Sequence, residues 1–266
     1  TVPEEDPHDF ACATTAMWIR YPHYPHYDGT ELNIRTVPAR LRKRGFVGTA
    51  LQIERLSDQP LNGYAIDGGD NTSLDADFTS AAHCALVDVS ALARLGVHGS
   101  HAASFLDEHG YQLPDVPNQA TRQPDGSLVA RLSASEYLLL GSLNAQEQRI
   151  SQQEATWPPA QAGVYLLPRQ DTHAWLALTG THASNVMAKL CGVDLSPAAF
   201  APGQVAQTSV ARANAIVINA SQTELTCLYL LVDSASASYF WPVLLDAMQE
   251  FGGKPLSIKA FMNKVS

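Results

Sequence analysis

The stretch that decides the fold is VDVSALARLGVHGSHAASFL, residues 87–106, because a shorter version of it recurs downstream. The second copy is AWLALTGTHASNVMAKL, residues 174–190. The cores of the two copies, Val97-x-Gly-Ser-His-Ala and Leu178-x-Gly-Thr-His-Ala, are separated by a constant offset of 81 residues. This recurrence predicts that the chain consists of two halves related by internal duplication.

Each copy predicts a strand followed by a helix. Apolar residues alternate before the glycine, as in a half-buried strand, and Gly99 and Gly180 allow a sharp exit from it. Ser100 and Thr181 are expected to cap the following helices by accepting a backbone N–H bond. The apolar faces expected of these helices are Ala102, Phe105 and Leu106 in the first copy and Ala183, Val186, Met187 and Leu190 in the second.

A second pair of similar segments, Glu136–Leu140 and Leu228–Val232, predicts a further strand in each half, followed by a helix. Each half therefore reads strand, helix, strands, helix, which indicates the α+β fold class. A proline pair at 158–159 cannot continue a helix and marks the expected boundary between the halves. We expect the C-terminal residues 255–266 to be exposed or docked on a partner.

Composition is that of a globular protein with a substantial core, since 45% of the 266 residues are hydrophobic and 16% are charged. The formal charge of −9 argues against nucleic acid as a partner, because phosphate neutralisation needs a basic face. No apolar run has a membrane-spanning length, and the first residues lack a signal-peptide pattern, so we expect no membrane and a cytoplasmic location. The four cysteines are dispersed, without zinc-type spacing.

Residues 1–79 are predicted to form an irregular arm, rich in aromatic residues and stiffened by proline. Two interpretations of the segment around His23 remain open. One is a zinc site in which His8, His23 and His26 meet Asp28, and the other is a docking loop for a partner, which we favour because no third ligand has firm spacing. The predicted docking residues are Trp18, Tyr21, His23, Tyr24, His26 and Tyr27.

The chain resembles the gamma subunit of heterotetrameric sarcosine oxidase, a relative of the glycine cleavage T-protein, which is an aminomethyltransferase. Single matches are short, and their order and spacing over residues 80–253 carry the resemblance. The matching segments are DVS at 88–90 with the Gly99 turn, PDVPN at 114–118, ASEYLLL at 134–140, LCGVDL at 190–195, FAPGQVAQT at 200–208 and SYFW at 238–241.

The resemblance implies two ferredoxin-like halves packed around a central hole, at residues 80–157 and 158–266 with the C-terminal tail. It also implies a non-catalytic subunit of a flavin-dependent amine oxidase, or N-demethylase, that acts on a sarcosine-like substrate and is linked to folate metabolism. FAD or FMN and tetrahydrofolate are then expected on flavoprotein partner subunits of a hetero-oligomer. No cofactor is expected on this chain, and its Leu86–Ser90 strand lacks the G-x-G-x-x-G of a dinucleotide site.

The sequence departs from the aminomethyltransferase pattern where catalysis would need a carboxylate. Asp115 replaces the acidic pair of that family as the nearest candidate, and residues 213–223 lack the later folate-binding glutamate element. As a loop aspartate close to proline, Asp115 is more typical of a turn than of a general base. His101 and His182 occupy equivalent positions in the two copies and are candidates for a pair of imidazoles at one cavity, although a structural role explains them better. We predict no catalytic, cofactor or metal residues.

Three functions remain as hypotheses. The first is the non-catalytic oxidase subunit, which accounts for the missing carboxylates. The second is a stand-alone tetrahydrofolate-dependent aminomethyltransferase, and the third is a zinc-binding accessory protein centred on His8, His23 and His26.

Overall fold

The computed structural model describes residues 81–142, 149–158, 162–223 and 225–265, together with two short parallel strands, β1 (Lys43–Arg44) and β2 (Tyr64–Ala65). All of these belong to one compact unit, Lys43–Ser266. Apart from β1 and β2, the predicted arm lies outside the described residues, and so do the six aromatic and histidine residues assigned to docking and the proposed zinc ligands.

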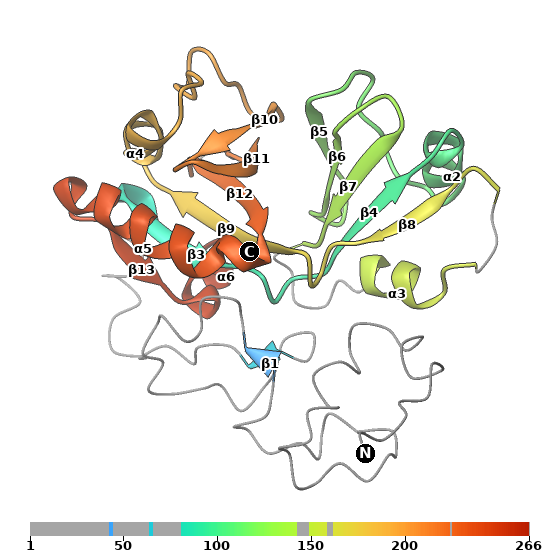
Figure 1. Ribbon diagram of the computed structural model, residues 1–266, viewed down its shortest axis with the longest axis horizontal. Coiled ribbons are helices and arrows are strands. Elements are labelled where there is room, and N and C mark those ends of the chain that lie inside the picture. The colour runs from blue at the N-terminus through green and yellow to red at the C-terminus, as the bar shows by residue number, and fades with distance from the viewer. Residues whose placement is uncertain are drawn as a thin grey trace, which may run out of the picture. The chain divides into compact units, whose positions relative to one another are not determined.

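The described residues form two halves, each built on one largely antiparallel sheet with helices on its outer face (Figure 1). We call the five-stranded sheet β5-β6-β7-β4-β8 sheet I. Its elements follow the β-α-β-β-α-β succession of a ferredoxin-like unit, with β5 as an added edge strand. They are β4 (Arg94–His98), α2 (Ala102–Glu108), β5 (Gln119–Arg122), β6 (Leu128–Arg131), β7 (Glu136–Leu140), α3 (Arg149–Ala155) and β8 (Tyr165–Pro168).

The six-stranded sheet β10-β11-β12-β9-β3-β13 is sheet II, in which only the edge strand β13 pairs in parallel. It begins with β3 (Ala85–Asp88), which precedes all of sheet I in the chain. Its other strands and helices are β9 (His173–Thr179), α4 (Ala183–Leu190), β10 (Val205–Val210), β11 (Ala213–Asn219), β12 (Cys227–Asp233), η4 (Ser234–Ser236), α5 (Ala237–Met248), η5 (Gln249–Phe251), β13 (Lys254–Leu256) and α6 (Ile258–Val265).

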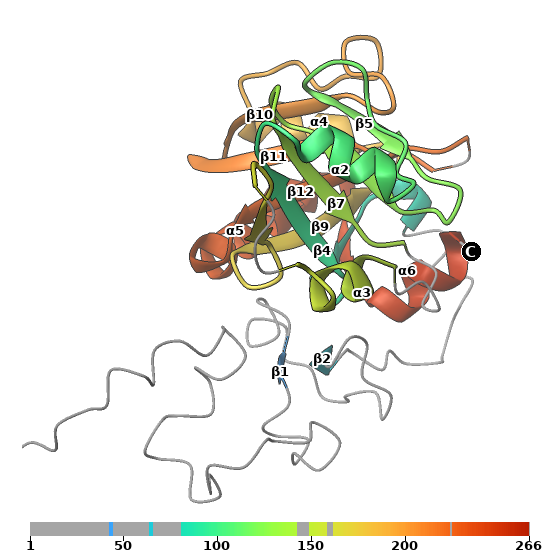
Figure 2. The ribbon, with the colours of Figure 1, turned by 90° about the vertical axis from the view of Figure 1, so that its right-hand side faces the viewer.

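Alternation along the strands divides the apolar residues among three cores. In β12, Leu228 and Leu230 face α4 and α5, whereas Tyr229 and Leu231 face the inner core between the two sheets. The outer face of sheet I packs against Phe105 of α2 and Ile150 of α3. The order of layers is therefore helices, sheet II, sheet I, helices, and Figures 1 and 2 show α2 outside β4 and β7.

The two sequence copies occupy equivalent positions in the two sheets. Val97 on β4 pairs with Tyr137, and Leu178 on β9 pairs with Leu228, so both lie on the strand that leads into the matching helix, α2 or α4. Both glycines have a positive φ, 135° at Gly99 and 100° at position 180, and an added Cβ at either would lie within 2.5 Å of backbone atoms of a neighbouring segment. The equivalence fits the predicted duplication, and common descent of the halves stays a prediction.

The predicted caps are wrong by one residue. The N-cap positions of α2 and α4 are His101 and His182, and neither side chain makes a capping bond. The backbone explains this, because the N–H of Ala102 donates to Gly99 O and the N–H of Ala183 donates to Gly180 O, both at 3.1 Å. Backbone carbonyl groups of the two glycine turns thus accept the bonds that Ser100 and Thr181 were expected to accept. The expected apolar helix faces are buried except for Leu190, which is partly exposed.

Each half gives one strand to the sheet of the other. β3 lies before β4 in the chain but pairs with β9 in sheet II, and β8 lies after the boundary expected at 157/158 but pairs with β4 in sheet I. The two sheets therefore do not coincide with the two predicted halves of the chain. The domain boundary at 157/158 remains a prediction. The two crossing connections, 89–93 and 169–172, run between the sheets.

A buried arginine joins these two connections. The Arg94 side chain is 0% exposed and donates six hydrogen bonds of 2.6–3.1 Å to five backbone carbonyl oxygens. The accepting residues are Ser90 and Leu92 on the first connection, Arg169 and Gln170 on the second, and His173 at the start of β9. Gln170 also donates to Ser90 O at 3.1 Å, so the crossing is closed by side chains from both segments.

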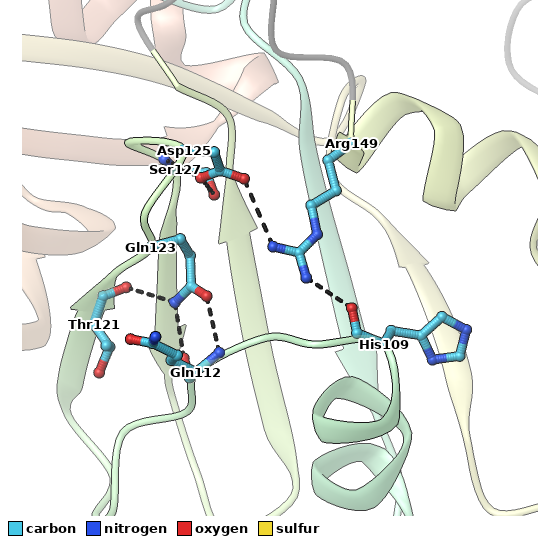
Figure 3. Close-up of polar contacts among 7 residues, drawn as sticks. All are labelled: His109, Gln112, Thr121, Gln123, Asp125, Ser127 and Arg149. Carbon is cyan, nitrogen blue, oxygen red and sulfur yellow. Dashed lines mark hydrogen bonds and ion pairs between the residues drawn. The ribbon is translucent and has the colours of Figure 1, made fainter.

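On the outer side of sheet I, two side chains fix the loop that follows α2 (Figure 3). Arg149 donates to His109 O at 2.7 Å, pairs with Asp125 at 3.6 Å and lies over the Tyr111 ring at 3.7 Å. Gln123, 3% exposed, exchanges two 2.8 Å hydrogen bonds with the backbone of Gln112 and donates to Thr121 O. These contacts hold the first part of the loop, residues 109–112.

The C-terminal residues are part of the core, contrary to the prediction that they are exposed or docked on a partner. β13 pairs with β3, and Ile258 and Phe261 of α6 are buried in the core between the sheets. The local reason is the Gly252 turn, with φ 62°, which ends η5 and returns the chain to the edge of sheet II. No helix among the described residues is both long and apolar enough to span a membrane.

Candidate functional site

A cavity of about 420 Å³ lies on the inner face of sheet II. The cavity opens to solvent, because Gln207, Ser209 and Asn214 of its lining are exposed. Strand register explains the lining, because Gln207, Ile216 and Leu231 stand opposite one another on neighbouring strands, and Ser209 stands opposite Asn214. The lining residues are His173, Gln207, Thr208, Ser209, Asn214, Ala215, Ile216 and Leu231.

His173 is the titratable residue of the lining. Its Nδ1 lies 2.8 Å from Thr172 Oγ1, and its Nε2 lies 3.5 Å from a guanidinium nitrogen of Arg169. Burial lowers the pKa of His173 from 6.5 to about 4, and the charges of Arg169 and Arg94 act in the same direction, whereas Asp233 opposes them. The imidazole is therefore neutral at pH 7 and acts as a hydrogen-bonding group without charge.

Arg169 connects the cavity region to sheet I. It pairs with Glu136 at 2.6 Å, and its side chain lies across the backbone of Gly96, where a Cβ would stand 2.9 Å from Nε. The close approach requires glycine on β4, and it leaves the buried Nε without a hydrogen-bond partner among the described residues. Glu136 is thus engaged in an ion pair with Arg169.

The other polar groups of the lining are neutral. Gln207 donates to Leu132 O at 2.7 Å and to Asn118 Oδ1 at 2.9 Å, which ties sheet II to sheet I. Within the described part of the chain, the side chains of Ser209 and Asn214 make no hydrogen bond, so both are available to a ligand. Among the described lining residues there is no carboxylate or thiol. The described lining therefore offers hydroxyl, amide and imidazole groups for hydrogen bonding to a ligand.

The hairpin at the cavity's rim has an unusual turn. Ala211 and Arg212, which join β10 to β11, have φ values of 48° and 65°, in the left-handed region that favours glycine or asparagine. Neighbouring groups hold this turn, because the Ala211 N–H donates to Leu190 O at 2.8 Å and the Tyr239 hydroxyl donates to Ala211 O at 3.1 Å. The turn fixes the relative position of Ser209 and Asn214, the strand residues closest to it in the lining.

The structure does not place the predicted candidate residues in this cavity. Asp115 is exposed in the loop between α2 and β5, where its backbone carbonyl accepts a 2.6 Å hydrogen bond from Arg131. His101 is exposed, and its Nδ1 lies 3.2 Å from Ala162 O. None of the three candidates, Asp115, His101 and His182, belongs to the lining.

His182 contacts different groups from its counterpart. Its ring stacks on Phe251 at a centroid distance of 4.8 Å and meets the edge of His83 at 4.7 Å. Each imidazole thus contacts segments that adjoin its own sheet, and the two do not form a pair. No cluster of three or more histidine, cysteine, aspartate or glutamate side chains suited to a metal occurs in the described residues, and the ligands of the zinc hypothesis lie outside them.

Sequence reasoning missed His173, Gln207 and Asn214. The available signal was the alternation of polar residues in VAQTSV, 205–210, which places Gln207 and Ser209 on one face of the predicted strand pair. His173 gave no comparable signal, because its environment depends on the exchange of strands between the sheets.

The described part of the chain is an α+β protein built on two largely antiparallel sheets with helices on their outer faces. Residues 78–264 match the GCVT N-terminal domain family, and the chain belongs to this family. Comparison with curated protein sequences gives no match.

Two solved structures are similar in fold. A chain of the heterotetrameric sarcosine oxidase from Corynebacterium sp. U-96, in complex with pyrrole 2-carboxylate, is 23% identical with a TM-score of 0.53, and the match covers 64% of this chain and 86% of that one. The glycine cleavage system aminomethyltransferase T from Bartonella henselae is 15% identical with a TM-score of 0.60. That match covers 82% of this chain but only 60% of the aminomethyltransferase.

Proposed function

We propose that this chain is a non-catalytic, gamma-type subunit of a multisubunit flavin-dependent oxidase that acts on a sarcosine-like amine. The observation that carries the proposal is the extent of the match to a heterotetrameric sarcosine oxidase, which covers 86% of one of its chains. The match to the aminomethyltransferase covers 82% of this chain and 60% of that one.

The chemistry of the cavity supports the same proposal. Activation of an amine or of folate by general acid–base catalysis requires a group whose pKa suits proton transfer near neutral pH. The described lining offers His173, with its pKa lowered to about 4, and neutral amides and hydroxyls. FAD or FMN and tetrahydrofolate would then be bound by the partner subunits, and this chain would contribute to assembly.

Purification of the native complex through a tag on the full chain tests this function. The expected result is a stoichiometric flavoprotein partner, visible by its flavin absorbance, with amine oxidase activity in the complex and none in the isolated chain. Isolation of the chain without a flavoprotein, under conditions that preserve known oxidase complexes, would contradict the proposal.

A stand-alone aminomethyltransferase is the second candidate, favoured by the TM-score of 0.60 to aminomethyltransferase T. It predicts that the isolated full chain binds tetrahydrofolate. Calorimetry with tetrahydrofolate separates the two functions, since the subunit proposal expects no binding in the micromolar range. Binding that is lost in Asp115→Ala, or in Asn214→Ala at the cavity, would favour the transferase and would identify the carboxylate or the cavity as the site.

A further inference from the structure

The two sheets end differently at their outer edges. In sheet II, β13 pairs in parallel with the outer edge of β3, with Pro255 opposite Leu86. In sheet I, the last strand is β8, which among the described residues pairs with β4 alone. One half of the fold therefore has an added edge strand, and the other half lacks it.

β3 and β8 occupy equivalent positions, so the comparison is residue by residue. Leu86 stands opposite Leu178 on β9, and Leu166 stands opposite Val97 on β4. Val97 and Leu178 are the matching residues of the two sequence copies. Leu166 is consequently the counterpart of Leu86, the β3 residue that stands opposite Pro255 of β13.

Successive residues of a strand direct their N–H and C=O groups alternately to its two sides, and this alternation places those of Leu166 on the outer edge of β8. The Gly99 N–H donates to Ser135 O, so β4 directs the backbone groups of Gly99 and Val97 toward β7 and those of Gly96 and His98 toward β8. Gly96 and His98 stand opposite Leu167 and Tyr165, and these two β8 residues bond inward. The N–H and C=O of Leu166 then point to the free edge.

The side chains along this edge are apolar and accessible. Tyr165 is 60% exposed, and Leu166 and Leu167 are partly exposed. Free edges of native sheets are normally protected by a short strand, by proline, by lysine, by a bulge or by a covering segment; β8 has four residues and ends in Pro168, and it carries no lysine. Pro168 limits the edge at its C-terminal end, and its carbonyl is already engaged by the Thr172 hydroxyl at 2.9 Å.

We propose that the outer edge of β8 receives an extended strand of the flavoprotein partner subunit, running parallel to β8 in the register that β13 adopts on β3. This inference rests on the proposed function. The strand of this chain that fills the equivalent position, β13, is already committed to sheet II. The incoming strand places an apolar or aromatic side chain beside Tyr165. One residue of the incoming strand stands opposite Leu166, and the next residue of that strand is not proline, because its N–H must reach Leu166 O.

Hydrogen exchange on the full chain, alone and in the native complex purified through a tag, tests this pairing. The Leu166 amide is expected to exchange freely in the isolated chain and to be protected in the complex. Protection already in the isolated chain would mean that another segment of this chain fills the edge, and would overturn the proposal. A flavoprotein complex in which Leu166 stays unprotected would also overturn it while leaving the proposed function intact. Failure to obtain a flavoprotein complex would reject both.

A matched pair of variants separates the backbone contact from side-chain packing. Leu166→Pro removes the outward N–H without removing an N–H that bonds β4, whereas Leu166→Ala loses the same packing but keeps the amide. Partner affinity is expected to fall about ten-fold or more in Leu166→Pro relative to Leu166→Ala. Equal affinities of the two variants would contradict the pairing. Exchange at the β4 and β7 amides verifies that both variants are folded.

Discussion

Substitution of Arg94 by leucine should remove the strongest polar link between the two sheets. Two of its five acceptors, Leu92 O and Gln170 O, receive no other hydrogen bond among the described residues, so the variant leaves both without a donor. An unsatisfied buried acceptor costs about 1–3 kcal/mol, and the sum for the two is roughly 4 kcal/mol. This is a large part of the ~5–15 kcal/mol by which a domain is stable.

Urea denaturation of the full chain, followed by far-UV circular dichroism, measures this loss as a lower midpoint. Arg212→Leu is the matched control, because Arg212 is exposed and makes no contact among the described residues, and its effect should stay within about 0.5 kcal/mol. Arg94→Lys should fall between the two, since an ammonium group has three donors for the same five carbonyls. A loss below about 1 kcal/mol in Arg94→Leu would show that water replaces the guanidinium, and would refute the reasoning.

Three further variants test other parts of the fold. Arg212→Gly should raise the free energy of unfolding by roughly 0.5–1 kcal/mol, because glycine removes the penalty of the left-handed backbone at φ 65°. Ala213→Gly, in the adjoining strand, should lower the free energy of unfolding, and thermal denaturation compares the two variants. Because the pKa of His173 is lower in the folded chain, the unfolded chain binds a proton at a higher pH than the folded chain does, and stability is lost as pH falls from 6.5 toward about 4. This loss should be smaller in His173→Gln, as measured by urea titrations across that pH range. Gln123→Glu should destabilise by roughly 2–4 kcal/mol at pH 7, because a buried carboxylate faces Gln112 O and Thr121 O, and near pH 4 the deficit should become smaller. An unchanged deficit at low pH would show that lost geometry, not charge, causes the effect.

Local patterns were sufficient to predict most elements of the fold. The strand and helix around Gly99 and their counterparts around Gly180 follow from apolar spacing and from the need for a positive φ, and the structure has both. The second pair of repeated segments was aligned one residue out of register. Tyr137 packs on the outer face of sheet I, whereas Tyr229 lies in the core between the sheets, so the counterpart of Tyr137 is Leu228. A shift of one residue reverses the face of a strand, and similarity of letters does not resolve it.

The candidate site was less predictable because it depends on contacts that are distant in sequence. The predicted residues were chosen by their chemistry and by repetition, which led to His101, His182 and Asp115. The cavity instead uses His173, whose pKa is lowered first by burial and then by the charges of Arg169 and Arg94, which the crossing of two connections brings close. Nothing local to His173 distinguishes it from an ordinary surface histidine. The alternation of Gln207 and Ser209 on β10 was visible, but only the position of the opposing sheet shows which face is open.

The exchange of strands explains why the strongest polar contacts and the candidate site lie close together. Because β3 completes sheet II and β8 completes sheet I, neither sheet is complete if the chain is divided at 157/158. Both connections must cross between the sheets, and their carbonyl groups would be buried without partners unless a donor such as Arg94 met them. The same crossing places Arg169 beside His173, whose pKa is lowered first by burial and then by the charge of Arg169. The requirement to satisfy the crossing backbone thereby contributes to a neutral histidine at the cavity.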